Sequence, residues 1–187
     1  MIIAQQKRKE NIAEYLLYLW QVEDMLRACD LDIERVEQTL VSRYDIDDAT
    51  RAQVRDWYEN LVEMMRHEHL RDGGHLQISK NVLIRLNDLH VQLLRESDRF
   101  PQYHAAFYSA LPLIVELRAR AGDNAVGELE TCFNLLYGVM MLRLQSKAVS
   151  EGTEKALTTV SYFIGLLAAY FHKDEEKPLF EPTDDDE

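Results

Sequence analysis

The sequence is poor in the residues that interrupt helices and in those that cross-link chains. It has seven glycines, four prolines and two cysteines among 187 residues. A β-rich fold needs frequent turns made from glycine and proline, and these residues occur at about half their average frequency. The first hundred residues contain no proline, and their only glycines are Gly73 and Gly74. We therefore predict an all-α fold, a helical bundle of about six to seven helices.

The two cysteines and the lack of long apolar runs exclude further classes. Cys29 and Cys132 lie far apart and form no CxxC pair, which excludes a disulfide framework and a zinc ribbon. No apolar segment of signal-peptide length follows the N-terminus. The longest uncharged run, residues 156–171, is shorter than the roughly twenty residues that span a bilayer. We expect a cytoplasmic protein that has no membrane partner.

Basic residues are also scarce. The chain has 21 Lys and Arg residues against 33 Asp and Glu residues, a net charge of −12. Phosphate binding needs clustered basic residues, so this balance argues against nucleic acid as a partner. Half of the excess lies in residues 173–187, which hold eight acids against two lysines. We predict a single all-α domain over residues 1–172, followed by a disordered, mobile acidic tail.

Three stretches carry almost no charge: residues 15–20, 132–142 and 156–171. Each lies inside a helical pattern, so each helix is apolar nearly all the way round. Such a helix belongs at the centre of a bundle or under a partner subunit. We predict a homodimer in which the first and the last two helices form the seam. The predicted interface residues are Tyr18, Trp20, Met141, Phe163 and Leu167.

The helix boundaries follow from capping residues. We predict a first helix from about residue 4 to residue 28, a second capped by Asp30 or Asp32, and later helices capped by Ser79 and Ser150. Between them, Thr50 and Gln53 can form a capping box, with Asp47 and Asp48 as competing caps. The expected inward face of that helix is Val54, Trp57, Leu61 and Met64. The last helix is expected to end near His172.

Glycines suggest two further features. The pair Gly73–Gly74 is the sharpest interruption in the chain, and it predicts a hinge between two sub-bundles at residues 72–76. Gly138, Gly165 and Ala169 are small residues on otherwise bulky helices. Small residues let two helix backbones approach closely, so we expect the last two helices to pack tightly against each other at these positions.

The histidines do not form a standard metal motif. No Glu-x-x-His pair lies on a helix, as a di-iron bundle requires, and there is no His-Glu-x-x-His segment. The nearest approach to a site is Glu63 with His67, one helical turn apart, and His75 from the glycine turn. We predict no metal and no cofactor, with these three residues as the only metal candidates.

Paired and isolated acids give two other candidate features. Two Glu-x-x-Glu pairs, residues 34–37 and 151–154, resemble halves of the magnesium motif of all-α nucleotide pyrophosphohydrolases. The second half, Glu-x-x-Asp on a following helix, is missing, so we interpret them as exposed acids. Glu14, Glu23 and Asp24 interrupt the apolar first helix, and any of them that faced inward would be a candidate acid or base. A solvent-facing seam is the preferred interpretation.

The tail contains one apolar pair. Leu179 and Phe180 lie between Pro178 and Pro182 and are flanked by acids. Segments of this kind dock in grooves, so these two residues are candidate anchors for a protein partner. The alternative is that they pack on their own domain.

The opening MIIAQQKRKENIAEYLLYLWQVEDMLRA resembles the start of an uncharacterised bacterial family, a domain of unknown function. The resemblance covers residues 1 to about 172. It implies an all-helical cytoplasmic protein, and it brings no activity, cofactor or catalytic residue.

Two functions remain open from the sequence. The preferred one is a non-enzymatic homodimer that acts through protein contacts. The alternative is a small-molecule or metal-binding bundle, or an enzyme, with a pocket lined by aromatic residues. That pocket would be lined by Tyr15, Trp20, Tyr137 and Tyr162.

Overall fold

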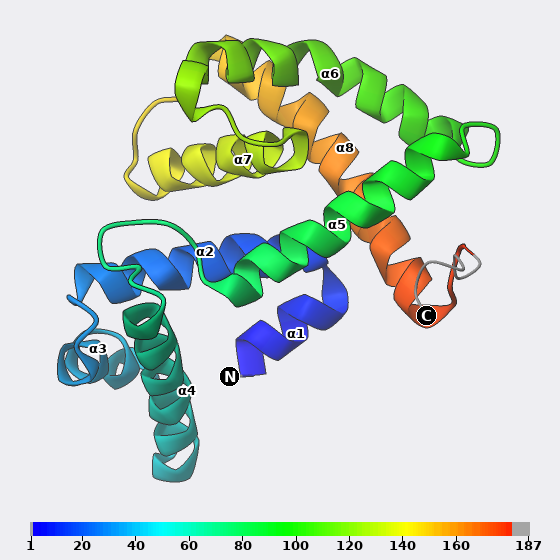
Figure 1. The fold of residues 1–187 in the computed structure, drawn as a ribbon. Coiled ribbons are helices and arrows are strands. Elements are labelled where there is room, and N and C mark those ends of the chain that lie inside the picture. Colours follow the sequence, from blue (N-terminus) through cyan, green and yellow to red (C-terminus); the bar gives the residue numbers. More distant parts are fainter. Residues whose placement is uncertain (1, 181–187) are drawn as a thin grey trace. The chain divides into compact units, whose positions relative to one another are not determined.

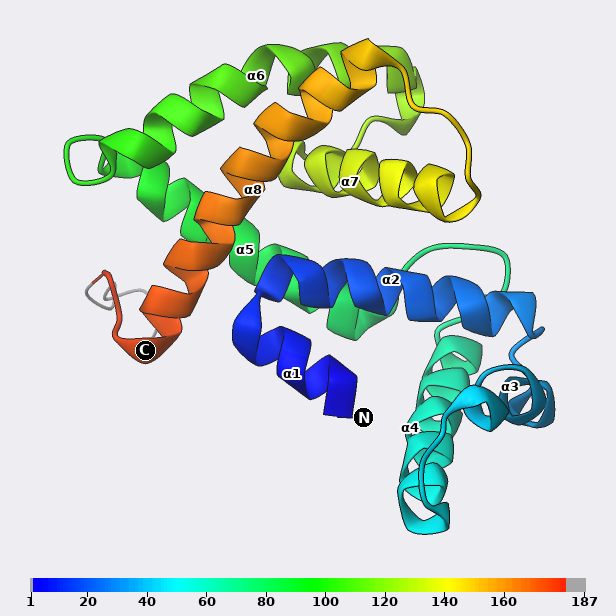
Figure 2. The same cartoon turned by 180° about the vertical axis from the view of Figure 1, so that it is seen from behind.

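The computed structural model describes residues 2–180, and all regular structure in this range is helical (Figures 1 and 2). The elements are α1 (Ile2–Glu10), α2 (Ile12–Ala28), α3 (Ile33–Thr39), the 3₁₀ turn η1 (Val41–Arg43), α4 (Asp48–His67), α5 (Gln77–Arg95), α6 (Pro101–Ala121), the 3₁₀ turn η2 (Gly122–Asn124), α7 (Glu128–Leu144) and α8 (Glu151–Glu176). The predicted all-α fold is confirmed. The described residues form eight α-helices rather than six to seven.

The chain divides into two compact units. The first contains the residues up to Glu10 together with Glu14–Val82. The second contains Asn11–Ala13 together with the described residues from Leu83 onward. The division falls inside α5, whereas the hinge predicted at residues 72–76 lies within the first unit.

In the first unit, α3 packs on α4. Asp32 caps α3 as predicted, because its carboxylate accepts hydrogen bonds from the backbone N–H groups of Glu34 and Arg35. Asp47 caps α4 by accepting from the Thr50 N–H at 2.9 Å. The core between these elements is formed by aliphatic residues and one buried tyrosine: Val22, Leu26, Val36, Val41, Val54, Tyr58, Leu61, Val62 and Met65.

Three helices of the second unit pack on one another: α6 and α7 both contact α8, and α6 also contacts α7 (Figure 2). Rings from two helices meet in this core. Phe163 of α8 lies 5.5 Å from both Tyr103 and Phe107 of α6, measured between ring centroids. Pro101 occupies the first turn of α6, where its missing N–H costs no helical hydrogen bond. Cys132 is buried in α7, where a free cysteine packs as a small apolar residue.

The predicted first helix is in fact two helices. The break is at Asn11, whose side-chain oxygen accepts a hydrogen bond from the Ala13 N–H at 3.0 Å. Asparagine is among the best helix N-caps, because its short side chain replaces the missing intrahelical acceptor. The apolar pattern of the segment continues across this point, so the periodicity alone did not reveal the break.

Two predictions about the middle helices are wrong. Ser79 does not cap α5, which begins at Gln77; its hydroxyl instead bonds to a carboxylate from α2. The buried face of α4 is rotated relative to the prediction. Tyr58 and Met65 are buried, whereas Trp57 and Met64 are only partly buried.

The last helix begins as predicted and ends later. Ser150 caps α8 by accepting from the Thr153 N–H, and the helix continues to Glu176, four residues beyond the predicted end. The first part of the predicted tail is therefore helical. The predicted disorder of residues 181–187 concerns a segment outside the described residues.

The expected close packing at glycines is also wrong. A Cβ atom built on Gly138 or on Gly165 would meet no atom within 4 Å. Gly138, Gly165 and Ala169 are all exposed. These small residues therefore lie on the outer faces of α7 and α8, and larger residues mediate the contact between the two helices.

Three helices end with a non-glycine residue in the left-handed conformation. Asp30, His69 and Ser146 have φ values of 57°, 57° and 55°. In each case the next residue donates its N–H to a carbonyl five residues earlier, as in the bond from Lys147 to Leu142 at 2.9 Å. This is the Schellman termination, which is usually built with glycine because a Cβ atom disfavours positive φ.

Candidate functional site

A buried carboxylate is the most unusual polar feature of the first unit. Glu23 of α2 is only 1% exposed. Its Oε1 accepts from the Ser79 hydroxyl at 2.7 Å and from the Leu76 N–H at 3.1 Å, and its Oε2 lies 2.7 Å from His75 Nδ1. An ionised carboxylate can only accept, so Nδ1 carries the proton that points at Glu23. A buried charge without such partners is strongly destabilising, and here donors surround both oxygens.

The ring of His75 is held from a second direction. It stacks on Trp20 with ring centroids 4.2 Å apart and an interplanar angle of 16°. Its side chain is 28% exposed, and its Nε2 makes no hydrogen bond with any described residue. The carboxylate at Nδ1 fixes the orientation of the ring and leaves Nε2 as its open nitrogen. Chemically it can accept a proton or bind one ligand.

The segment that carries His75 is fixed to α2 at further points. Arg27 donates to the carbonyl oxygens of Leu70, at 3.0 Å, and Gly74, and it also pairs with Asp24 at 2.7 Å. The guanidinium thus satisfies backbone groups next to the two glycines, where the chain has no regular structure of its own. Glu23 and Arg27 together tie the segment between α4 and α5 to one face of α2.

The predicted metal candidates are not brought together. His75 is engaged with Glu23, and Glu63 and His67 are exposed residues of α4. Among the described residues, no group of three or more His, Cys, Asp or Glu side chains has the geometry to hold a metal ion. The four aromatic residues predicted to line one pocket are divided between the two units, Tyr15 and Trp20 in the first and Tyr137 and Tyr162 in the second.

A second histidine is buried in the other unit. His90 of α5 is 3% exposed, and its Nδ1 lies 2.6 Å from the Tyr103 hydroxyl. Burial, with a smaller contribution from the charge of His104, lowers the pKa of His90 to about 4. Burial raises the pKa of Tyr103, so the phenol keeps its proton and donates to Nδ1. The distance from Nε2 to the Glu128 carboxylate is 3.9 Å, too long for a hydrogen bond. His90 is therefore a neutral core residue.

Cys132 is equally unsuited to chemistry. Burial, with a smaller contribution from the charge of Glu128, raises the pKa of its thiol to about 12. A nucleophilic cysteine needs a lowered pKa, because the thiolate is the reactive form. Cys132 is thus a packing residue.

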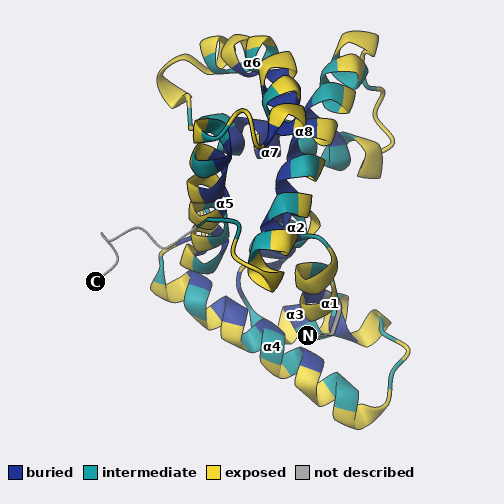
Figure 3. Ribbon diagram, turned by 90° about the vertical axis from the view of Figure 1, so that its right-hand side faces the viewer, coloured by how far each residue is buried: buried dark blue, intermediate teal, exposed yellow. Residues whose placement is uncertain are grey.

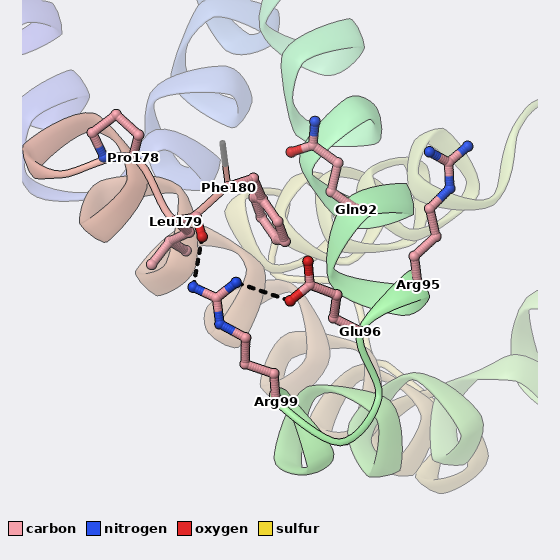
Figure 4. Close-up of a pocket in the computed structure, with 7 residues that line it drawn as sticks. All are labelled: Gln92, Arg95, Glu96, Arg99, Pro178, Leu179 and Phe180. Atoms are coloured by element: carbon pink, nitrogen blue, oxygen red, sulfur yellow. Dashed lines mark hydrogen bonds and ion pairs between the residues drawn. The ribbon is translucent and has the colours of Figure 1, made fainter. Parts of the chain in front are cut away.

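The C-terminal residues that are described dock on their own chain (Figure 4). Arg99 donates to the Leu179 carbonyl at 2.6 Å and pairs with Glu96 at 2.8 Å. The Leu179 N–H donates to Asp174 at 2.8 Å, and the ring of Phe180 lies 5.6 Å from that of Phe100. Leu179 and Phe180 are both partly buried. Of the two alternatives for this pair, packing on the same chain is the arrangement in the structure, and binding of a separate partner remains a prediction.

One side of α6 is exposed (Figure 3). A series of uncharged exposed residues runs along it and into η2 at alternating steps of four and three, beside the exposed ion pair of Glu116 and Arg120: Pro101, Ala105, Tyr108, Pro112, Val115, Ala119 and Gly122. We call this set the outer stripe. Tyr108 is 61% exposed and Val115 is 57% exposed. The spacing is that of a helical seam, and nothing in the described chain covers it.

The predicted interface residues lie elsewhere. Trp20, Phe163 and Leu167 are buried within the single chain, and Tyr18 and Met141 are partly buried. The first three consequently offer little area to a partner while the chain keeps this fold. The reason is that the apolar helices supply the chain's own core.

Two features of the structure differ from what the sequence predicts. Glu23 faces inward rather than toward solvent, and its apolar neighbours Trp20 and Val22 are the signal in the sequence for this burial. The outer stripe repeats every three and four residues, as does the buried series Tyr103, Phe107, Ala110 and Ile114 of the same helix. A spacing of this kind does not by itself say which of two series faces the core.

The structure thus defines an all-helical protein of two compact units, with a buried carboxylate–histidine cluster in one and an exposed stripe of uncharged residues in the other. None of the described helices combines the length and the apolar character that crossing a bilayer would require. The chain belongs to the family described as a domain of unknown function (DUF4924), whose model matches residues 1–178. No curated protein and no solved structure gave a match. The family resemblance of the opening segment is confirmed.

Proposed function

We propose that the protein is a non-enzymatic helical protein that acts through protein contacts as a homodimer, with the outer stripe of α6 as its interface. The observation that supports this proposal is the exposure of an uncharged heptad series on one helix. Water-exposed apolar seams of this spacing are typical of helix pairing.

The stripe is suited to pairing with itself. Pro112 lies at its centre, with Ala105 and Ala119 seven residues to either side and Tyr108 and Val115 between them. In an antiparallel pair related by a two-fold axis near Pro112, Tyr108 of one copy faces Val115 of the other, and Ala105 faces Ala119. A two-fold interface requires this kind of self-complementarity. Antiparallel helix dipoles also attract each other.

The charge distribution favours this face over others. Two copies of a chain with a net charge of −12 repel each other. Contact through the uncharged stripe places no like charges directly against each other. The stripe between Ala105 and Ala119 is about 21 Å long at 1.5 Å per residue. One helix of this length covers less than the roughly 800 Å² per partner of a standard interface, so the dimer is expected to be weak, with a micromolar Kd.

Sedimentation equilibrium of the full chain tests the proposal. We expect Tyr108→Glu and Val115→Glu each to weaken the dimer at least about tenfold, because each places a desolvated charge in the seam. Ser161→Glu, at an exposed position of α8, is the matched control and should leave the dimer intact. Added NaCl should strengthen the wild-type dimer by screening the net repulsion. A wild-type chain that stays monomeric at high micromolar concentration contradicts the proposal.

The alternative, a ligand- or metal-binding bundle, has one observation in its favour. His75 presents an open Nε2 whose ring is fixed by Glu23 and Trp20. A single nitrogen does not make a ligand site, and no group of three or more His, Cys, Asp or Glu side chains among the described residues could hold a metal ion. The cluster is better explained as the fixing point of the segment between α4 and α5.

A further inference from the structure

The structure contains a docked peptide in the form of its own C-terminal segment. We propose that the groove formed by Gln92, Glu96, Arg99 and Phe100 is a recognition site for a Pro–Leu–Phe peptide, and that it binds residues 177–180 of a second copy of the chain when the cis segment leaves. This site is separate from the outer stripe of α6, so it adds a second contact between copies to the proposed function.

The contacts of the cis segment combine backbone and ring recognition. Arg99 holds the Leu179 carbonyl at 2.6 Å, and its guanidinium also lies over the rings of Phe100, at 5.1 Å, and Phe180, at 5.6 Å. The backbone bonds at Leu179 would accept any residue, whereas the stacked set of Phe100, Arg99 and Phe180 requires an aromatic ring. The groove therefore selects a peptide by its phenylalanine.

The cis segment does not need a strong intrinsic affinity to occupy the groove. The Arg99 side chain is 52% exposed, and its ion pair with Glu96 is a surface pair, which contributes little to stability. Only Lys177, Pro178 and Leu179 separate the end of α8 from Phe180. This short connection gives the cis segment a high effective concentration, so occupation in cis does not require a strong intrinsic affinity.

The groove also contains a pocket and an exposed arginine that the cis segment does not contact through an ion pair. A pocket of about 560 Å³ lies between the segment and the end of α5, lined by Gln92, Arg95, Glu96, Arg99 and residues 178–180 (Figure 4). Arg95 is exposed and makes no ion pair with a described residue. A peptide with an acid after its phenylalanine could pair with this guanidinium, and the sequence of the chain itself continues with Glu181.

The test uses the full chain with its own segment disabled. In the double variant Leu179→Ser, Phe180→Ser the groove is vacated without altering α8. The probe is a fluorescein-labelled peptide of the sequence EEKPLFEP, that of residues 175–182. We expect fluorescence anisotropy to show that the peptide binds the double variant at least about tenfold more tightly than the wild type, whose own segment competes. In the double-variant background, Arg99→Gln should weaken binding about tenfold, and Arg120→Gln, an exposed residue of α6, should not.

Three results would overturn the proposal: no binding to the double variant up to about 1 mM peptide, equal binding of a peptide with serine in place of its phenylalanine, or binding unaffected by Arg99→Gln. Circular dichroism of each variant verifies that the helices are retained. The double variant keeps the outer stripe, so its dimer can be measured independently of peptide binding. A double variant that forms the dimer but does not bind the peptide contradicts this proposal and leaves the proposed function standing.

Discussion

At the scale of single residues, Glu23 is a buried side chain that joins α2 to the segment before α5 and to the first turn of that helix. Its partners His75, Leu76 and Ser79 are supplied by one short segment. We expect Glu23→Gln to lower the free energy of unfolding by about 2–3 kcal/mol, because the amide replaces one acceptor oxygen by a donor that faces other donors. Urea unfolding measures this loss. Glu14→Gln on the exposed face of α2 is the control, with an expected change within about 0.5 kcal/mol; equal losses for the two variants would show that the buried cluster has no special role.

His90 makes stability depend on pH. Its pKa is about 4 in the folded chain and about 6.5 when exposed, so the unfolded chain binds more protons between these values. The free energy of unfolding therefore rises as the pH is raised from about 4 to about 6.5. Acidification through the same range lowers it. The contribution is at most about 3 kcal/mol. In His90→Gln we expect a flatter pH profile than in the wild type or in His67→Gln, measured by urea unfolding at several pH values. Parallel profiles for all three chains would contradict this assignment.

At the scale of elements, several helices end with a non-glycine residue in the left-handed conformation, where glycine would be favoured. Ser146 ends α7 at a φ of 55°, and a residue with a Cβ atom is disfavoured there by about 1 kcal/mol relative to glycine. We expect Ser146→Gly to raise the free energy of unfolding by about 0.5–1 kcal/mol, since the gain exceeds the entropy that glycine adds to the unfolded chain. Thermal unfolding measures the gain. Ser109→Gly, in the interior of α6, should have the opposite sign. If Ser146→Gly also lowers the melting temperature, the strain is not stored at this position.

The same scale shows why helices were easier to predict than their limits. The caps at Asp32 and Ser150 act within three residues of their own position, so the sequence around them was sufficient. Ser79 is a residue type that often caps helices, but its hydroxyl donates to Glu23, which lies 56 residues earlier in the chain. The local sequence around Ser79 gives no sign of so distant a partner. Asn11 is the exception, a local cap hidden by a continuous apolar pattern.

At the scale of the whole molecule, the all-α class followed from composition, whereas the division into two units did not. The hinge was predicted at Gly73–Gly74 because glycine interrupts local structure. The observed division falls inside α5, where the local sequence continues unbroken, because it is determined by which residues pack together over long separations. The predicted interface shows the same dependence: Phe163 and Leu167 are apolar in either environment, and only tertiary packing decides that they are covered by their own chain.

The hydrogen bonds of Glu23 also bear on the order of folding during synthesis, because its partners are made later than Glu23 itself. Glu23 leaves the ribosome before its partners, and Ser79 is added 56 residues later. At about 5–20 residues per second, this leaves the carboxylate without its partners for about 3–11 s. Throughout that interval, burial of Glu23 would leave its oxygens without donors, which is energetically costly. The native packing of Glu23 thus requires that the segment carrying His75, Leu76 and Ser79 has already been made.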